Sequence, residues 1–472
     1  MNKMLTHLNG YKREAVLAPL FKMLEATFDL FVPLVMADIV NVGITAHDFH
    51  YILVRCGILL LLAVVGLACS LTAQYFSAKA AVGYSTSLRH ALFEHIQRLG
   101  FTEMDTMGTS TLITRMTSDI NQVQSGLNLF LRLFLRSPFV VVGAMIMAFT
   151  INAKLASIYL VAVIILGGCL VLIMSRASNY FSAAFKKYDD LNESVQENVS
   201  AIRVVKAYVR EDYESEKFKK ASGNVQDLLL RAEKVLSFNS PLMMATVYTC
   251  ILLISWLGAR MIVLSGATSF TTGELMSMLT YCTNILTSLM MLSMVFIMIS
   301  MSAASAKRVA EVLEEESTLS NGENPVMEVK NGAVRFDHVC FRYKADGRDV
   351  LSDINLNIRS GETIGIIGGT GSAKTSLVQL LPRLYDTTAG HVYIGGVDVR
   401  DYDLEILRNS VAMVLQKNEL FSGTIAENLR WGNKDATDAE IEEACKQACA
   451  DEFIERFPDK YPLQNAAHKA GR

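Results

Sequence analysis

Charged residues are scarce in this 472-residue sequence. They make up only 19% of it, whereas hydrophobic residues make up 51%, and the formal net charge is −3. So large an apolar fraction is untypical of a soluble enzyme and indicates burial in a membrane. Lys and Arg show no excess over Asp and Glu, so the composition gives no support to nucleic-acid binding. The length allows two or three domains.

The sequence also lacks the signs of a disulfide framework, a zinc site and a secretion signal. Cys445 and Cys449 are spaced as on one helix face, but no histidine accompanies them at zinc-site spacing. We therefore interpret the cysteines as structural thiols in a reducing compartment. The polar N-terminal stretch MNKMLTHLNGYKRE contains no cleavable signal. The cysteines are residues 56, 69, 169, 250, 282, 340, 445 and 449.

Five long stretches within the first 310 residues contain no charged side chain. A helix needs roughly 20 residues to cross a bilayer, so each stretch predicts a transmembrane helix. Basic residues are concentrated in the two long loops between these stretches, 76–136 and 176–234, whereas the short links hold only Lys154. This asymmetry predicts that the long loops and both termini are cytoplasmic. The five stretches are 56–78, 137–153, 155–175, 235–259 and 275–306.

A sixth, weaker span covers about residues 14–40 and contains Lys22, Glu25 and Asp29. These three groups fall on one helix face, where they either contact a transported substrate or pair with neighbouring groups; we favour pairing. The last span is rich in methionine, whose side chains either line an adaptable pocket or pack against other helices; we favour packing. The sequence thus predicts six spans, and the helical spacing of apolar residues in the long loops predicts helical stalks beyond the bilayer.

The composition of the sequence changes after about residue 311. An acidic stretch rich in Ser, Asn and Gly suits a linker, and beyond it short β-type runs alternate with helical patterns. Such alternation is typical of an α/β domain. We therefore expect a transmembrane domain over 1–315, a linker over 316–330 and an α/β domain over 331–472.

The stretch GGTGSAKTS fits the phosphate-loop pattern G-x-x-x-x-G-K-[ST] except at one position. The run TIGIIG before it predicts a buried strand, and TSLVQLL after it a helix. In such a loop the backbone N–H groups surround the β-phosphate, the lysine reaches the β- and γ-phosphates, and the Thr hydroxyl ligates Mg²⁺. The alternative is a glycine-rich turn without a ligand. The candidate residues are Gly368, Gly369, Thr370, Gly371, Ser372, Ala373, Lys374, Thr375 and Ser376.

Ala373 occupies the position where the pattern requires glycine. Its methyl group either crowds the phosphate or disfavours a backbone conformation that glycine permits. A negative φ, with the methyl pointing away from the phosphate, would make the substitution cheap. We expect weakened rather than abolished nucleotide binding.

From about residue 10 to 460 the chain resembles the ATP-binding cassette (ABC) exporter family, in particular bacterial half-transporters that fuse six membrane helices to one nucleotide-binding domain. MGTSTLITRMTSDINQVQ (107–124) and VQENVSAIRVVKAYVREDYESEKF (195–218) resemble its two cytoplasmic-loop patterns. The resemblance implies that these loops carry coupling helices, which contact the nucleotide-binding domains.

Two further stretches resemble nucleotide-contacting segments of this family. FRYKADGRDVLSDINLNIRSGE is similar to the segment whose aromatic residue stacks on adenine, here Tyr343; the alternative is a buried strand tyrosine. VAMVLQKNELFSGTIAENLRWG (411–432) resembles the glutamine loop, in which Gln416 would contact Mg²⁺ or the attacking water. The implied cofactors are therefore ATP and Mg²⁺.

The resemblance ends after DEFIERFPDKY. The family continues into an L-S-G-G-Q signature, an apolar strand ending in Asp-Glu (the Walker B strand and catalytic Glu) and a switch His, whereas this sequence ends in PLQNAAHKAGR. We interpret the chain as a truncated or frame-shifted product that cannot hydrolyse ATP alone. The expected fold is an all-α six-helix transmembrane domain followed by a truncated α/β P-loop nucleotide-binding domain.

By this resemblance we expect one half of a dimeric transporter in a bacterial cell membrane, surrounded by lipid. It would export a small molecule, drug, lipid or peptide in an ATP-driven cycle. The second subunit would be an identical or a different half-transporter; we favour a different one, because an altered phosphate loop is tolerable when only one of two sites must hydrolyse. The alternatives are a non-hydrolysing regulatory subunit that binds nucleotide and an inactive fragment.

Overall fold

The computed structural model describes residues 4, 6–266, 268–344, 346–415, 420–457 and 461. Its internal contacts divide the chain into two compact units, Met1–Thr318 and Leu319–Arg472. The predicted linker over 316–330 therefore falls on both sides of this division. The domain boundaries at 315 and 330 stay predictions, and we describe the two units separately.

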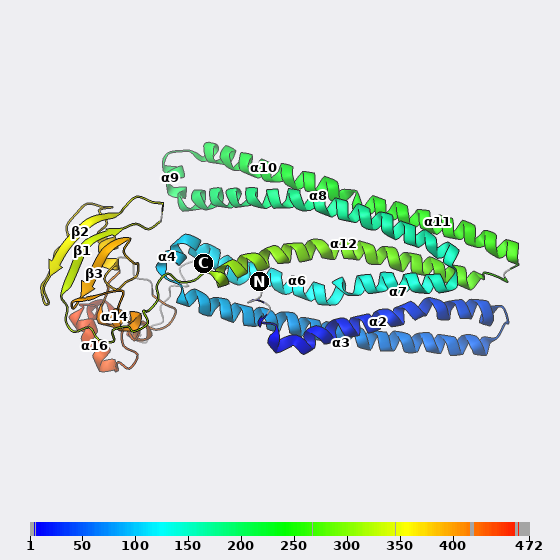
Figure 1. The fold of residues 1–472 in the computed structure, drawn as a ribbon, viewed down its shortest axis with the longest axis horizontal. Coiled ribbons are helices and arrows are strands. Elements are labelled where there is room, and N and C mark those ends of the chain that lie inside the picture. Colours follow the sequence, from blue (N-terminus) through cyan, green and yellow to red (C-terminus); the bar gives the residue numbers. More distant parts are fainter. Residues whose placement is uncertain are drawn as a thin grey trace. The chain divides into compact units, whose positions relative to one another are not determined.

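Unit 1 is built of helices (Figure 1). Six of its helical segments are long and apolar enough to cross a bilayer, which confirms the predicted number of spans. The helices are α2 (Lys12–Asp38), α3 (Phe49–Arg98), α4 (Phe101–Met107), α5 (Thr109–Thr114), α6 (Ile120–Leu129), α7 (Arg136–Ile151), α8 (Ala153–Ser200), α9 (Ile202–Ala207), α10 (Glu211–Ser237), α11 (Asn239–Ser265) and α12 (Thr272–Glu314).

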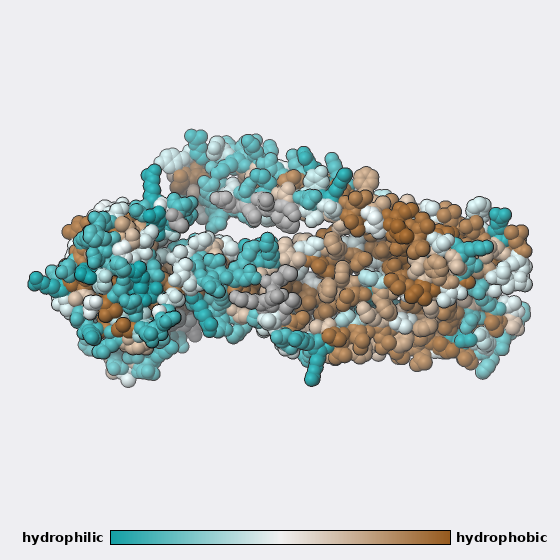
Figure 2. Space-filling model, in the orientation of Figure 1, coloured by the Kyte–Doolittle hydropathy of each residue, from teal (hydrophilic) through white to brown (hydrophobic). Residues whose placement is uncertain are grey.

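The longest of these helices extend well past any bilayer. Helix α3 has 50 residues, about 75 Å at 1.5 Å per residue, against a hydrocarbon core of about 30 Å. Apolar side chains gather over the α7 and α11 part of unit 1, and polar side chains cover the part around α9 and α10 (Figure 2). The helices therefore continue beyond the apolar zone, as the helical spacing of apolar residues in the long loops predicts.

Side-chain capping starts several of the spans. Asp48 accepts a hydrogen bond from the Tyr51 N–H at 3.0 Å before α3, and Asn152 accepts one from the Leu155 N–H at 3.2 Å before α8. Thr271 and Glu274 form a capping box at the start of α12. Each cap satisfies backbone N–H groups that lack a partner in the first helical turn.

Buried hydroxyl groups tie the membrane helices together. The Tyr281 hydroxyl donates to the Leu30 carbonyl at 2.6 Å, and the Ser277 hydroxyl donates to the Pro33 carbonyl at 2.6 Å, so α12 is joined to α2. The Tyr159 hydroxyl donates to the Met278 carbonyl at 2.7 Å and joins α8 to α12. These bonds satisfy polar groups that could not be left without a partner in an apolar interior.

The charged groups predicted on the first span are paired. The Lys22 ammonium lies 2.5 Å from the Glu25 carboxylate and also donates to Ser70 at 3.2 Å. The Asp29 carboxylate lies 2.9 Å from the Arg136 guanidinium of α7. Pairing, the favoured interpretation, is thus what the structure contains.

The methionines of the last span do not follow the favoured interpretation. Met278 is fully buried, but several others remain exposed in the single chain because they lie on a face of α12 that no described helix covers. The exposed ones are Met276, Met290, Met291, Met294 and Met301, with exposed fractions of 41% to 63%.

Unit 2 contains a four-stranded antiparallel sheet with strand order β2-β1-β3-β4. In β1, Val334 pairs with Ile358 of β2 on one side and with Ile394 of β3 on the other. One face of the sheet packs on the segment after the glycine-rich loop through Leu380 and Tyr385. The elements are β1 (Val334–Phe341), β2 (Leu351–Ile358), α13 (Lys374–Gln379), β3 (Ala389–Ile394), β4 (Val397–Asp398), α14 (Leu404–Ser410), α15 (Ile425–Leu429), α16 (Asp438–Gln447) and α17 (Asp451–Ile454).

The predicted buried strand TIGIIG is absent among the described residues. Residues 362–369 have no regular secondary structure, and Ile367 is 99% exposed. The physical reason is pairing: an apolar strand needs hydrogen-bonding neighbours in a covered sheet, and no described segment of unit 2 pairs with these residues. The sequence pattern therefore predicted a strand that this structure does not form.

Side chains hold the first part of the segment between α12 and the sheet. In unit 1, the Thr318 N–H and hydroxyl donate to the Glu103 carboxylate at 3.1 and 2.8 Å. In unit 2, Asn321 donates to Asp403 at 2.6 Å and accepts from the Leu404 N–H at 3.0 Å. The predicted linker is therefore held by side-chain hydrogen bonds on both sides of the unit boundary.

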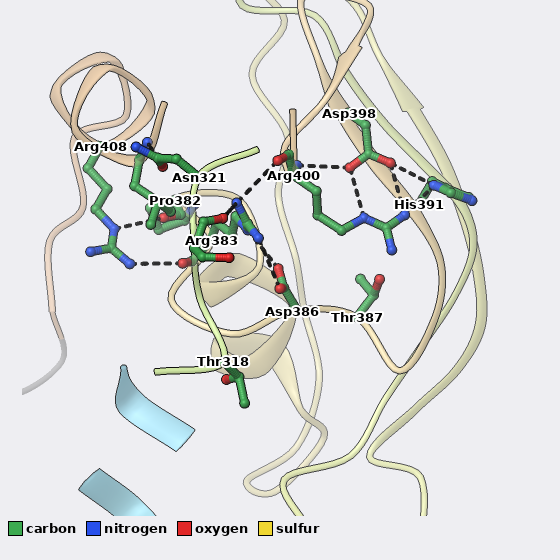
Figure 3. Close-up of polar contacts among 12 residues, drawn as sticks. Thr318, Asn321, Pro382, Arg383, Asp386, Thr387, His391, Asp398, Arg400 and Arg408 are labelled. Atoms are coloured by element: carbon green, nitrogen blue, oxygen red, sulfur yellow. Dashed lines mark hydrogen bonds and ion pairs between the residues drawn. The ribbon is translucent and has the colours of Figure 1, made fainter. Parts of the chain in front are cut away.

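Arg383 connects Ser320, at the start of unit 2, with the rest of that unit (Figure 3). Its buried guanidinium donates to the Asp386 carboxylate at 2.8 and 3.1 Å, and to the carbonyl oxygens of Ser320 at 3.2 Å and Arg400 at 3.3 Å. One side chain thus connects three segments that are distant in the sequence.

We expect Arg383→Ala to lower the free energy of unfolding by about 2 kcal/mol, because a half-buried carboxylate and two carbonyls lose a charged donor. Thermal unfolding of the purified chain measures this. Arg335→Ala is the control, since the Arg335 side chain is 52% exposed, and it should shift the transition much less. Equal shifts for the two variants would contradict the assignment.

Candidate nucleotide-binding site

The glycine-rich loop leads directly into α13, which starts at Lys374. The Lys374 ammonium donates to the carbonyl oxygens of Gly368 and Gly369, both at 2.8 Å, and to the Ser372 hydroxyl at 3.1 Å. The loop is therefore wrapped around its own lysine. A positive charge encircled by backbone, at the start of a helix, suits a bound anion electrostatically.

The space around the loop also suits a phosphate group. An ideal Cβ at Gly369 or Gly371 would meet no atom within 4 Å, so the backbone there is open to a ligand. The Thr375 hydroxyl group belongs to an exposed residue at the second position of α13. Among the described residues no cluster of His, Cys, Asp or Glu could hold a metal ion by itself.

Ala373 has a left-handed backbone, with φ 60° and ψ 19°. This conformation costs a non-glycine residue roughly 1 to 2 kcal/mol, because Cβ approaches the following carbonyl oxygen. The residue is also half-buried and packs against the hydrophobic core of the sheet. The structure therefore contains the positive φ that makes glycine the better residue, and the condition under which alanine would be cheap is not met.

Tyr343 follows β1 and lies beside α13. Its hydroxyl group is 2.8 Å from the Ser376 hydroxyl and donates to Gln379 at 3.4 Å. The ring contacts Phe341 and Tyr385 edge-to-face, with centroids 4.8 and 5.3 Å away, and the residue stays 40% exposed. Residues far apart in the sequence, Tyr343 and the candidate loop, are thus brought to one place.

Gln416 lies outside the described residues, which do not include 416–419. The structure therefore does not relate the predicted glutamine loop to Lys374 and Thr375. Sequence reasoning missed Gln379, which anchors the Tyr343 hydroxyl. Its signal was present: Gln379 is three residues after Ser376 and so shares a face of α13 with it.

Comparisons with known proteins identify the family of the chain. A family model described as "ABC transporter transmembrane region" matches residues 16–288, and one described as "ABC transporter" matches residues 351–467. The chain is 32% identical to the "Uncharacterized ABC transporter ATP-binding protein YfiB" of Bacillus subtilis (strain 168), over 98% of this chain and 80% of that protein.

Two other relatives have comparable coverage. The "Uncharacterized ABC transporter ATP-binding protein MT1311" of Mycobacterium tuberculosis (strain CDC 1551 / Oshkosh) is 33% identical over 95% of this chain and 78% of its own length. The "Putative multidrug export ATP-binding/permease protein YgaD" of Bacillus subtilis is 29% identical over 98% of this chain and 80% of its own length.

Six apolar helices fused to an ABC transporter ATP-binding region define a multi-pass membrane protein. The chain belongs to the ABC transporter family. A half-transporter architecture of one membrane region and one ATP-binding region implies assembly with another ABC subunit.

We expect Ala373→Gly to raise the free energy of unfolding by about 1 kcal/mol, because glycine adopts the left-handed conformation without strain. We also expect tighter nucleotide binding, because glycine removes the conformational strain from the loop that holds the phosphates. Thermal unfolding and titration with a fluorescent ATP analogue measure the two effects. An unchanged nucleotide affinity would show that Ala373 does not impair the loop.

Proposed function

We propose that the chain is one half of an ATP-driven exporter. The observation that carries this proposal is the wrapped Lys374 loop on a chain that also supplies six membrane-spanning helices. The relative YgaD is named a putative multidrug export ATP-binding/permease protein, which supports export as the activity. The candidate substrates are the small molecules, drugs, lipids and peptides named in the sequence analysis.

In this proposal the loop residues 368–376 hold the phosphates of ATP. The Lys374 ammonium would exchange its carbonyl partners for β- and γ-phosphate oxygens, and the Thr375 hydroxyl would ligate Mg²⁺ together with Gln416. The exposed part of the Tyr343 ring would stack on adenine, since a phenol ring offers a flat apolar face to a purine. ATP supplies the free energy of its phosphoanhydride bond when it is hydrolysed.

The tip between α8 and α10 supports the coupling role proposed for the second long loop. The helices α8 and α10 pack side by side (Figure 1), and the short helix α9 turns the chain between them. Apolar side chains at this tip are left exposed: Val204 by 57%, Tyr208 by 75% and Val209 by 80%. Exposed apolar groups at a helical turn suit a contact with a nucleotide-binding domain.

We further propose that the long loops and both termini are cytoplasmic, as the distribution of basic residues predicts. The partner would be a second half-transporter, and we favour a different chain over an identical one. The strained alanine supports this choice, because a pair of unequal subunits can work with one hydrolysing site. The two alternatives to the export function are a nucleotide-binding regulatory subunit and an inactive fragment.

Lys374→Ala tests the nucleotide site. We expect at least about a tenfold loss of affinity for a fluorescent ATP analogue, because a charge-assisted contact to phosphate is lost. The chain is measured in lipid nanodiscs with Mg²⁺ present. Lys434→Ala is the matched control, since Lys434 is an exposed lysine of the same unit, and it should bind normally. Normal binding by both variants would overturn the proposed site.

Substitutions at Tyr343 test the adenine contact. Tyr343→Phe retains the flat ring and should bind the analogue nearly as well as the unmodified chain. Tyr343→Leu should bind roughly tenfold less tightly, because stacking on a base is worth about 1–3 kcal/mol. Equal affinity of the two variants would assign the tyrosine a structural role only.

ATP hydrolysis distinguishes the export function from its alternatives. We expect turnover by the chain co-expressed with a second half-transporter subunit, and loss of turnover with Lys374→Ala in this chain. Nucleotide binding without turnover in either setting favours the regulatory subunit. Rapid proteolysis of residues 315–472 without protection by ATP favours the inactive fragment.

A further inference from the structure

A polar cavity of about 410 Å³ lies within unit 1, between α2, α7 and α12. Most of its polar lining comes from one face of α12, and its charged lining is an ion pair between α2 and α7. Its volume is in the range of small-ligand pockets, about 300–1,000 Å³. The polar lining residues are Asp29, Arg136, Thr280, Asn284, Thr287 and Ser288.

The cavity lies within the apolar zone of the helices. Asp29 is 15 residues before the end of the helical segment at Ile44, Arg136 is 15 residues before Ile151, and Asn284 is 12 residues after Thr272. At 1.5 Å per residue these positions are about 18–22 Å from the helix ends, inside a hydrocarbon core of about 30 Å. Ionisable groups at such depth usually face protein or a water-filled cavity and mark a functional site.

The ion pair leaves binding capacity unused. The Asp29 side chain is 53% exposed although it lies 2.9 Å from Arg136. The Arg136 Nε atom is buried and has no hydrogen-bond partner among the described residues. A buried donor without a partner costs free energy, which an acceptor on a ligand can recover once the guanidinium moves toward it.

The uncovered face of α12 continues from the cavity as an apolar track. Met291 is seven residues after Asn284, so it lies two turns further along the same face, and it is 44% exposed. Met294 continues the track and is 63% exposed. Flexible thioether side chains suit an apolar group of variable shape.

We propose that this cavity binds the head group of a zwitterionic amphiphile, with its tail along the α12 track. The cationic group of the ligand would pair with Asp29, and its anionic group with Arg136. This inference rests on the proposed export function for the claim that the amphiphile is the transported substrate.

Charge balance is the reason for a zwitterion. A ligand of one sign would compete for one member of the pair and leave the other charged and alone at membrane depth, which is costly. A zwitterion replaces each partner by a ligand group of the same charge, so both Asp29 and Arg136 remain paired. The hydroxyl and amide groups of α12 then supply neutral hydrogen bonds around the head group.

The test uses four ligands with the same sixteen-carbon tail: hexadecylphosphocholine (zwitterion), hexadecyltrimethylammonium (cation), hexadecyl phosphate (anion) and hexadecanol. Binding of each radiolabelled ligand to the full chain in phosphatidylglycerol nanodiscs is measured at equilibrium, without ATP. We expect the zwitterion to bind at least tenfold more tightly than the other three.

Two variants should shift this selectivity in opposite directions. Asp29→Asn should weaken zwitterion binding about tenfold and favour the anion, because the guanidinium loses its partner. Arg136→Gln should weaken zwitterion binding about tenfold and favour the cation. The double variant Asp29→Arg/Arg136→Asp keeps a pair of opposite charges, so it should still prefer the zwitterion. It provides the test if a single variant does not fold.

Glu14→Gln is the matched control. Glu14 is on the same helix α2 and pairs with Lys79 at 2.9 Å, the length of the Asp29–Arg136 pair, but it does not line the cavity. All four affinities should be unchanged in this variant. Repeating the measurement in phosphatidylcholine nanodiscs identifies the source of the ligand: competition by the bilayer indicates a membrane phospholipid, and its absence a single-chain solute.

Equal affinity of the four ligands, or an equal loss of all four in both single variants, would overturn the inference. Binding of the fluorescent ATP analogue is measured on the same preparations. Normal ATP-analogue binding without zwitterion selectivity contradicts the substrate class alone. Zwitterion selectivity without ATP-analogue binding contradicts the proposed transport function and leaves the ligand site supported.

Discussion

Every backbone N–H and C=O group of a segment in hydrocarbon must find its partner within the protein, and the architecture of unit 1 follows from this constraint. Helices satisfy it locally, which is why the apolar segments of the sequence form rods rather than strands. The same requirement extends to side chains. The hydroxyl groups of Tyr159, Ser277 and Tyr281 each donate to a backbone carbonyl of another helix, so satisfying a polar group also fixes a helix contact.

Charges inside the bundle obey the same rule at a higher cost. Lys22 and Glu25 satisfy one another and Ser70, and they form a closed group. Asp29 and Arg136 are paired but remain open toward a cavity. The difference between the two pairs lies in their surroundings, because only the second adjoins the uncovered polar face of α12.

Unit 2 is subject to a different constraint, since water can satisfy its exposed backbone. Its loop around Lys374 is held by hydrogen bonds within the loop, and Ala373 accepts a left-handed backbone there. The segment between the units combines the two situations. Thr318 is bound by Glu103 and Ser320 by Arg383, so only Leu319 separates two anchored residues.

Much of this could be read from the sequence, because the signals are local. Six apolar segments, a phosphate-loop pattern and the pairing of Lys22 with Glu25 depend on spacing along the chain. The TIGIIG strand could not be predicted correctly, because a strand exists only through its neighbours. The exposure of the α12 methionines was also missed, because periodicity shows that a helix has faces but not what covers each face.

The sequence by itself determined that the chain crosses a membrane and contains a phosphate-loop pattern, since hydropathy and the spacing of the loop glycines, Lys374 and Thr375 are local properties. Tertiary structure alone decided that Tyr343 meets Ser376, that Arg383 holds Ser320, and that Asp29 pairs with Arg136 beside a cavity. These contacts join residues 33, 63 and 107 positions apart. Such contacts depend on how the elements pack, which no local pattern in the sequence specifies.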